Sequence, residues 1–119
     1  MTTAPHMIDA LLQLSEDIRY AAVYRDGELT SKQKTDTLDA SSAESDRYEE
    51  LLVNPALLTL ATQRGNIDCG GLDYVLVRYG HFFQFVLPQP WGHVSVCIAA
   101  DADPIELGAR IRALVADQG

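Results

Sequence analysis

The sequence has few basic residues for its length. Its 119 residues include 9 Lys and Arg against 17 Asp and Glu, which gives a formal net charge of -8. Nucleic acids and anionic membranes are bound through basic surfaces that neutralise phosphates, so this balance disfavours both as partners. A soluble protein or another partner that tolerates an acidic surface fits the charge better.

The chain also lacks long apolar runs. Apolar stretches such as 18–24 and 82–87 fall far short of the roughly 20 residues that a transmembrane helix needs. The first residues include neither the basic segment nor the apolar segment of a secretory signal. We therefore expect a cytoplasmic protein that does not insert into membranes.

Cysteine is scarce as well, since Cys69 and Cys97 are the only two. Without a secretory signal, two cysteines favour reduced thiols over a disulfide. Cys97 lies in the apolar stretch 94–99 and is expected to be a buried small hydrophobe. Cys69 stands beside two glycines, where we expect more exposure.

No motif for a metal, a nucleophile or a phosphate is present. His81 and His93 have no short paired spacing with Cys69 or Cys97 that would favour a zinc site or a Cys–His pair. We expect both histidines to be exposed, one in a turn and one at a strand start. The acidic stretch 36–50 lacks the spacing of a calcium loop and indicates a solvated surface. No catalytic residue, metal or cofactor is predicted.

The first half of the chain predicts a helix and a hairpin. Apolar spacing indicates a helix over 6–16, followed by strands over 18–24 and 28–34. Asp26-Gly27 between the strands favours a type I′ turn, which needs positive φ at both central residues. A polar surface loop is expected over 35–46.

A long helical stretch follows, with a proline inside it. Two capping-box pairs, Ser41 with Glu44 and Asp46 with Glu49, predict a helix start within 42–47. Asn54-Pro55 interrupts the apolar pattern, and proline costs about 3 kcal/mol inside a helix. We expect a kink or a break there, so that two helices over 46–53 and 55–64 and one bent rod are equally compatible with the sequence.

The second half predicts three strands and a closing helix. The strands are expected over 72–79, 82–87 and 93–99, with a type II′ turn at Gly80-His81 and a wider loop over 88–92. All three contain apolar residues at adjacent positions, which predicts helices on both faces of the sheet. Asp103-Pro104 is typical of a helix start, and the apolar spacing continues to Val115.

These elements predict a single α+β domain over 1–119, with 1–5 and 117–119 frayed. The order α-β-β-α-β-β-β-α resembles the roadblock/LC7 family of profilin-like domains. The residues that carry the resemblance are the opening helix 8–12, the strand and turn 20–27, the strand 94–98 and the helix 104–115. The resemblance covers about residues 6–116.

The resemblance implies a five-stranded antiparallel sheet between one long helix and two shorter ones. It also implies a homodimer that scaffolds or regulates small Ras-like GTPases. In roadblock domains the third strand and the central helix form the dimer, and these correspond here to 72–79 and 46–64.

The residues themselves give a separate reason to expect a dimer. An apolar edge strand at 72–79 would offer unpaired amides and carbonyls, and pairing with a second copy would satisfy them. Trp91 either projects toward a partner or folds over the sheet edge, and Tyr48, Leu57 and Leu58 can also be core. The candidate interface residues are Tyr48, Leu51, Leu52, Leu58, Tyr74, Leu76, Arg78 and Trp91.

The leading hypothesis is thus a non-enzymatic homodimeric interaction module. The alternative is a small-molecule sensor, because a sheet flanked by helices can hold a ligand cavity between sheet and helix. The aromatic residues proposed to line such a cavity are Tyr74, Tyr79, Phe82, Phe83 and Phe85.

Overall fold

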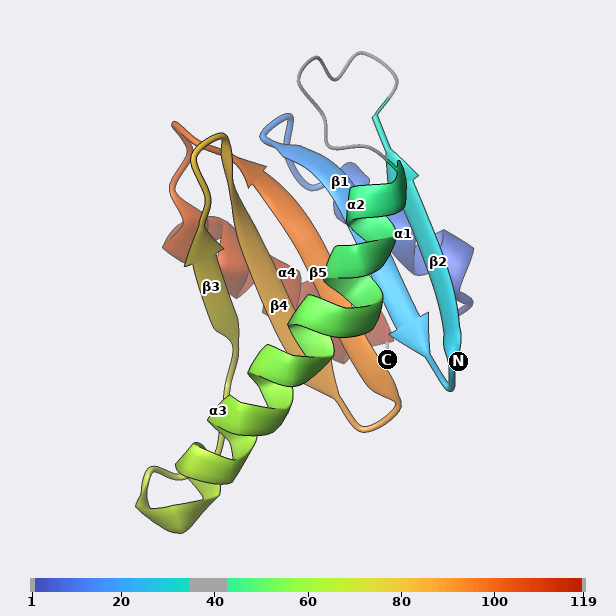
Figure 1. Cartoon of the computed structure of the whole chain (residues 1–119). Helices are drawn as coiled ribbons and strands as arrows, with labels where there is room; N and C mark the ends of the chain where they lie inside the picture. Colours follow the sequence, from blue (N-terminus) through green and yellow to red (C-terminus); the bar gives the residue numbers. More distant parts are fainter. Residues whose placement is uncertain (1, 35–42, 119) are drawn as a thin grey trace.

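A computed structural model describes residues 2–34 and 43–118, which form one antiparallel sheet with helices on both faces (Figure 1). The strand order is β2-β1-β5-β4-β3. This confirms the expected α+β architecture. The elements are α1 (Ala4–Leu12), β1 (Ile18–Arg25), β2 (Glu28–Gln33), α2 (Ala43–Tyr48), the π-helical turn η1 (Glu49–Val53), α3 (Asn54–Asp68), β3 (Val75–Arg78), β4 (Phe82–Gln89), β5 (Gly92–Ala99) and α4 (Pro104–Gln118).

The hairpin turns agree only in part with their sequence signals. Asp26 and Gly27 have φ angles of 52° and 88°, which confirms the type I′ turn. Gly80 lacks the positive φ of a type II′ turn, so that expectation was wrong. The expected wide loop is also absent, because Gln89 pairs with Gly92 across a turn of two residues.

One face of the sheet is apolar and packs against α1 and α4 (Figure 1). Strands β1, β4 and β5 turn alternate apolar side chains toward this face, and both helices add an apolar stripe. Asp103 starts α4 as an N-cap, since its Oδ1 accepts the amides of Ile105 and Glu106 at 3.1 Å each. Buried members of this core include Met7, Ile8, Leu11, Ala21, Val23, Phe85, Leu87, Val94, Val96, Ile98, Leu107, Ile111 and Val115.

The other face is covered diagonally by the helix formed by α2, η1 and α3, which we call the central helix (Figure 1). Here the buried strand residues include polar ones: Tyr20 from β1, Gln84 from β4, and His93 and Ser95 from β5. The prediction of helices on both faces is confirmed. The two faces nevertheless differ in chemistry.

The central helix runs through Pro55 without a break, so of the two alternatives left open by the sequence it is one rod, with Pro55 in the first turn of α3. The turn before the proline is π-helical, and the amide of Asn54 bonds to the carbonyl of Glu49. A π-helical turn is wider than an α-helical one, so it can accommodate Pro55, which has no amide hydrogen to donate to the preceding turn. The helix therefore continues to Asp68.

Several boundaries differ from those expected. The first helix is Ala4–Leu12 rather than 6–16, and α4 extends to Gln118, so Ala4, Pro5 and residues 117–118 are helical rather than frayed. Residues 43–46 begin α2, which confirms the expected start and places Asp46 inside the helix rather than at its cap. Residues 35–42, with Ser41, lie outside the described residues. Within the described ranges, no helix has the length and apolarity needed to cross a membrane.

Candidate functional site

A buried carboxylate joins the central helix to the sheet. Glu50 is 0% exposed, and Tyr20 Oη donates to its Oε2 at 3.1 Å. Its Oε1 accepts from Asn54 Nδ2 at 2.9 Å and lies 2.8 Å from His93 Nε2. One side chain of η1 thus bonds to β1, β5 and the first turn of α3.

The hydrogen bonds continue along the sheet beneath the helix. Asn54 Nδ2 also lies 3.3 Å from Ser95 Oγ, which bonds in turn to Gln84 Nε2. Cys97 Sγ donates to Gln84 Oε1 at 3.0 Å. Burial, with the carboxylates of Glu50, Asp46 and Glu49 nearby, raises the pKa of the Cys97 thiol well above its usual value. A thiol held in its neutral form is a poor nucleophile.

The burial of His93 corrects a sequence expectation. His93 was expected at an exposed strand start, but it is 2% exposed and its ring stacks on Tyr24 at 5.5 Å between centroids. The signal that would have revealed it is the alternation of His93, Ser95 and Cys97 on β5. Residues two apart share a face of a sheet, so these three polar side chains meet the same helix.

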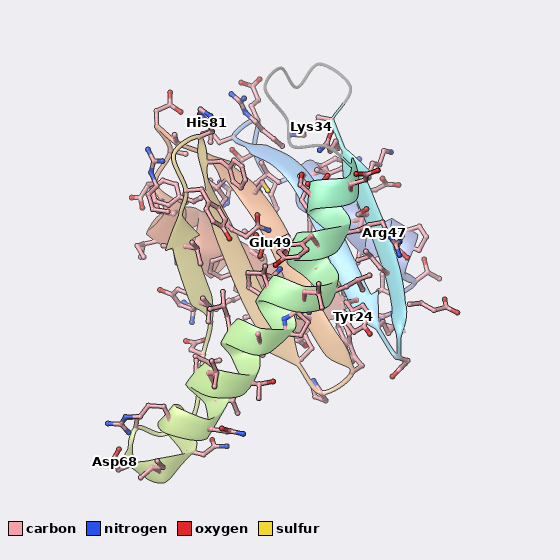
Figure 2. All side chains as sticks on the ribbon, in the orientation of Figure 1. Tyr24, Lys34, Arg47, Glu49, Asp68 and His81 are labelled. Carbon is pink, nitrogen blue, oxygen red and sulfur yellow. The ribbon has the colours of Figure 1, made fainter. Side chains whose placement is uncertain are left out.

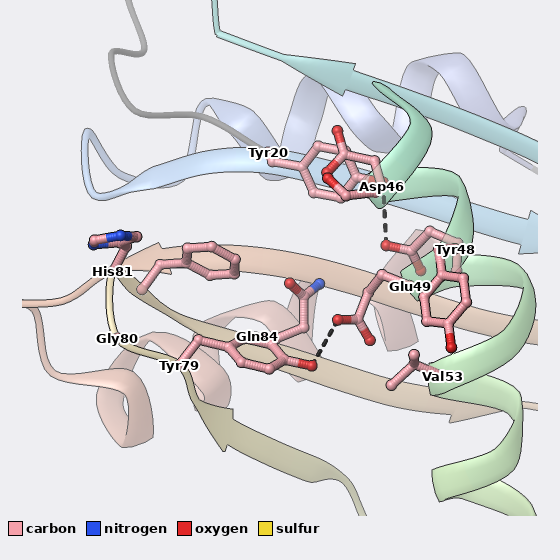
Figure 3. A pocket seen from close by; sticks show the side chains of 12 residues that line it. Tyr20, Asp46, Tyr48, Glu49, Val53, Tyr79, Gly80, His81 and Gln84 are labelled. Atoms are coloured by element: carbon pink, nitrogen blue, oxygen red, sulfur yellow. Dashed lines mark hydrogen bonds between the residues drawn. The ribbon is translucent and has the colours of Figure 1, made fainter. Parts of the chain in front are cut away.

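A cavity of about 380 Å³ opens beside this network, between the N-terminal half of the central helix and the sheet (Figure 3). Tyr79 Oη donates to Glu49 Oε1 at 2.7 Å, whereas Glu49 Oε2 is buried with no hydrogen-bond partner. Burial raises the pKa of Glu49, although the Tyr79 hydrogen bond acts in the opposite direction. The lining includes the rings of Tyr20, Tyr48, Tyr79 and Phe82 and the carboxylates of Asp46, Glu49 and Glu50.

Only part of the aromatic set expected at such a cavity lies there. Tyr79 and Phe82 line it, while Tyr74, Phe83 and Phe85 belong to the apolar face with α1 and α4 or pack against it. Phe85 is 0% exposed, and its ring centroid lies 4.9 Å from that of Tyr74. Alternation along β4 separates Phe83 and Phe85 from the cavity.

An apolar surface runs along the outer side of the central helix. Tyr48, Leu52, Leu60 and Ile67 are exposed by 61%, 59%, 66% and 75%. Tyr48 was expected either in the core or at an interface, and its exposure excludes the core. Leu51 and Leu58 are half-buried. Figure 2 shows the end of this helix at Asp68 projecting beyond the sheet. We call these four exposed residues the apolar stripe.

Strand β3 lies at the edge of the sheet and pairs only with β4 among the described strands. Leu76 packs against the apolar core with Tyr74, and the Arg112 guanidinium lies 5.4 Å from the centroid of the Tyr74 ring. Arg78 is exposed and stacks over Phe83 at 4.9 Å. At the open edge of the sheet, β3 therefore presents its backbone.

Trp91 folds back on the protein, which decides between the two orientations considered from the sequence. Its ring packs against the apolar core, and the Arg25 guanidinium lies 4.5 Å from the ring centroid. The Trp91 carbonyl accepts the amide of Asp26 at 2.9 Å.

The histidines and cysteines do not converge. Cys69 is exposed after the end of α3, and His81 is exposed in the β3–β4 turn, as expected. In the part of the chain that the structure describes, no group of three or more His, Cys, Asp or Glu is arranged to hold a metal ion.

The fold is similar to that of several solved structures. A Roadblock/LC7 domain from Streptomyces avermitilis superposes with a TM-score of 0.71 at 19% identity, covering 93% of this chain and 90% of that one. The gliding protein MglB from Thermus thermophilus gives 0.65 at 14% identity, over 98% and 92% of the two chains. MglC from Myxococcus xanthus gives 0.59 at 13% identity, over 93% and 92%. No family model matches the sequence, and no curated protein matches it significantly. The chain has the fold of roadblock domains.

Proposed function

We propose that this chain is a non-enzymatic protein-interaction module that acts as a homodimer. The observation that carries the proposal is the apolar stripe on the central helix, which lies on the same molecule as an open sheet edge. Contiguous exposed apolar surface on a folded domain marks a protein interface more often than chance. The fold of roadblock domains supports the same assignment.

The geometry suggests how two copies would meet. Strand β3 from each copy would pair across a two-fold axis and continue the sheet, as an isologous contact requires. The same axis would bring the central helices together, so that Leu52 and Leu60 of each copy lose contact with water. The net charge of -8 disfavours nucleic acid and anionic membrane as further partners, and we propose a cytoplasmic location.

The finer function is regulation or scaffolding of a small Ras-like GTPase. The resemblance to the roadblock family implies this role, and the structural likeness to the gliding protein MglB supports it. The acidic chain, with a net charge of -8, suits a basic patch on such a partner.

Light scattering after size-exclusion chromatography tests the dimer. The expected mass is twice the 13.1 kDa of one chain at micromolar concentration. Leu60→Asp, which places a charge in the apolar stripe, is expected to give the monomer. Ile105→Asp is the matched control, because Ile105 is similarly exposed at 59% but lies on α4, on the opposite side of the sheet. A monomeric wild-type protein, or equal effects of the two variants, would refute this interface.

The partner is tested with the same proteins. Ras-like GTPases from the source organism are loaded with GDP or with a non-hydrolysable GTP analogue and passed over the immobilised wild-type chain. We expect retention that depends on the bound nucleotide. Absence of retention for every GTPase in both states would remove the regulatory role and leave the dimer result intact.

A further inference from the structure

We propose that the cavity beside η1 binds a small organic ammonium ion. This inference goes beyond the interaction module, because the ligand would bind within one chain. Of the apolar stripe, only Tyr48 also lines this cavity. The volume of about 380 Å³ falls within the range of small-molecule sites, roughly 300–1,000 Å³.

Glu49 has one carboxylate oxygen without a hydrogen-bond donor. Its Oε1 accepts from Tyr79, but Oε2 is buried with no partner. A buried carboxylate oxygen without a donor costs free energy, more than a neutral group does. Figure 3 shows the carboxylate beside the cavity, between Val53 and Gln84. Because this oxygen is closed to water in the observed side-chain position, the Glu49 side chain would turn toward the cavity to accept a charged N–H donor from a ligand.

The cavity is lined by several acidic side chains. Asp46, Glu49 and Glu50 contribute carboxylates to the lining, and none of the described lining residues is a lysine or arginine. Glu50 and Asp46 already have partners in the protein, because Tyr20, Asn54 and His93 surround Glu50 and Gln33 Nε2 donates to Asp46 Oδ2 at 2.9 Å. Glu49 is therefore the carboxylate that remains to bind a cation, and its raised pKa reflects the burial that a bound cation would compensate.

The aromatic lining favours an organic cation over a metal ion. Tyr20, Tyr48, Tyr79 and Phe82 place aromatic rings in the lining. Ring faces attract ammonium groups through their quadrupole and give no oxygen ligands to calcium or magnesium. In the described residues no group of three or more His, Cys, Asp or Glu is arranged to hold a metal ion. Carboxylate and aromatic walls together fit an amine with an apolar body.

The test compares two probes that differ in charge. Calorimetry and two-dimensional amide NMR are run on the full chain with 2-phenylethylammonium and with its neutral analogue 2-phenylethanol, at near-physiological salt. We expect saturable binding of the ammonium, with amide shifts confined to Tyr20 and to 45–53 and 79–84. Its affinity should exceed that of the alcohol by about tenfold, because the ammonium donor is charged and the hydroxyl donor is neutral.

Two variants locate the site. Glu49→Gln retains an oxygen for Tyr79 but removes the charge, and it should weaken ammonium binding by about tenfold while leaving the alcohol unchanged. Glu44→Gln removes the same charge from an exposed position on α2 outside the cavity lining and should change neither.

Three results would overturn the proposal. One is the absence of saturable ammonium binding at millimolar concentration. Another is equal affinity for the two probes, which would mean that only the apolar body is recognised. The third is an equal loss in Glu44→Gln and Glu49→Gln, which would mean that the ion responds to the net charge of the chain rather than to this cavity.

Discussion

Glu50 makes more inter-element contacts than any other polar residue described above. A carboxylate withdrawn from water is costly, and it is compensated only when donors surround it. Tyr20, Asn54 and His93 are those donors, and each comes from a different element. The position of the helix over the sheet therefore depends strongly on one side chain.

Replacing Glu50 by alanine is expected to lower the free energy of unfolding by about 3–5 kcal/mol, because three buried groups lose their acceptor. Urea unfolding followed by circular dichroism measures the change. Glu44→Ala, an exposed carboxylate on the same helix, should stay within about 0.5 kcal/mol of wild type. A loss below about 1 kcal/mol for Glu50→Ala would mean that water replaces the carboxylate at little cost.

At this scale the sequence was only partly informative. Asp26-Gly27 and Asp103 predicted their own local structure, because a turn or a cap depends on a few neighbouring residues. The burial of Glu50 and His93 depends on residues 43 positions apart in the chain. No local pattern specifies such a pair, although the alternation on β5 was visible.

Among the helices and strands too, those set by nearby residues could be predicted from the sequence, whereas those that depend on distant partners could not. The strands and α4 follow their apolar periodicity, and the order of elements was sufficient to indicate the roadblock fold. For the central helix the sequence left two helices and one rod open, because the cost of Pro55 is local, whereas the π-helical turn before it contains Glu50, which bonds to the distant sheet. Strand β3 was expected over 72–79 but pairs only over Val75–Arg78, where β4 supplies partners.

The interface between central helix and sheet is expected to weaken at alkaline pH. Burial raises the pKa of Tyr79 from 10.0 to about 12, and burial together with Glu50 raises that of Tyr20 further. Both groups are neutral donors in the folded state. Because their folded pKa values lie above the unfolded value, their stabilisation is complete below about pH 10 and is lost as the pH rises toward and past 12.

Urea unfolding between pH 9 and pH 12 measures this effect, with the range taken from the titration of tyrosine near pH 10. The free energy of unfolding of the wild type should fall with pH above about pH 10, and Tyr79→Phe should fall less steeply. Tyr48→Phe, at an exposed position, is the control and should follow the wild type. Parallel curves for Tyr79→Phe and the wild type would contradict the raised pKa.

For the whole molecule, one chain is already compact. The radius of gyration is 13.5 Å, close to the value of about 13.5 Å that scaling gives for a folded domain of this length. Compactness does not need a second copy, even though the end of α3 extends beyond the sheet (Figure 1). We therefore expect the proposed dimer to dissociate into folded monomers on dilution.

Net charge should control that dissociation. Two chains that each carry -8 repel one another, and added salt screens this repulsion over a Debye length of about 10 Å at 0.1 M. Dimer affinity should rise as sodium chloride is increased, as measured by sedimentation equilibrium. A decrease with salt would indicate that ion pairs hold the copies together rather than the apolar stripe.

The unequal faces of the sheet also affect the heat capacity of unfolding. Exposure of apolar surface raises this quantity and exposure of polar surface lowers it. Unfolding exposes the apolar core beneath α1 and α4, which raises the heat capacity. It also exposes the buried polar residues beneath the central helix, which lowers it: Glu50, Gln84, His93 and Ser95. The stability curve of this chain should therefore be flatter with temperature than that of a domain of equal length with two apolar faces.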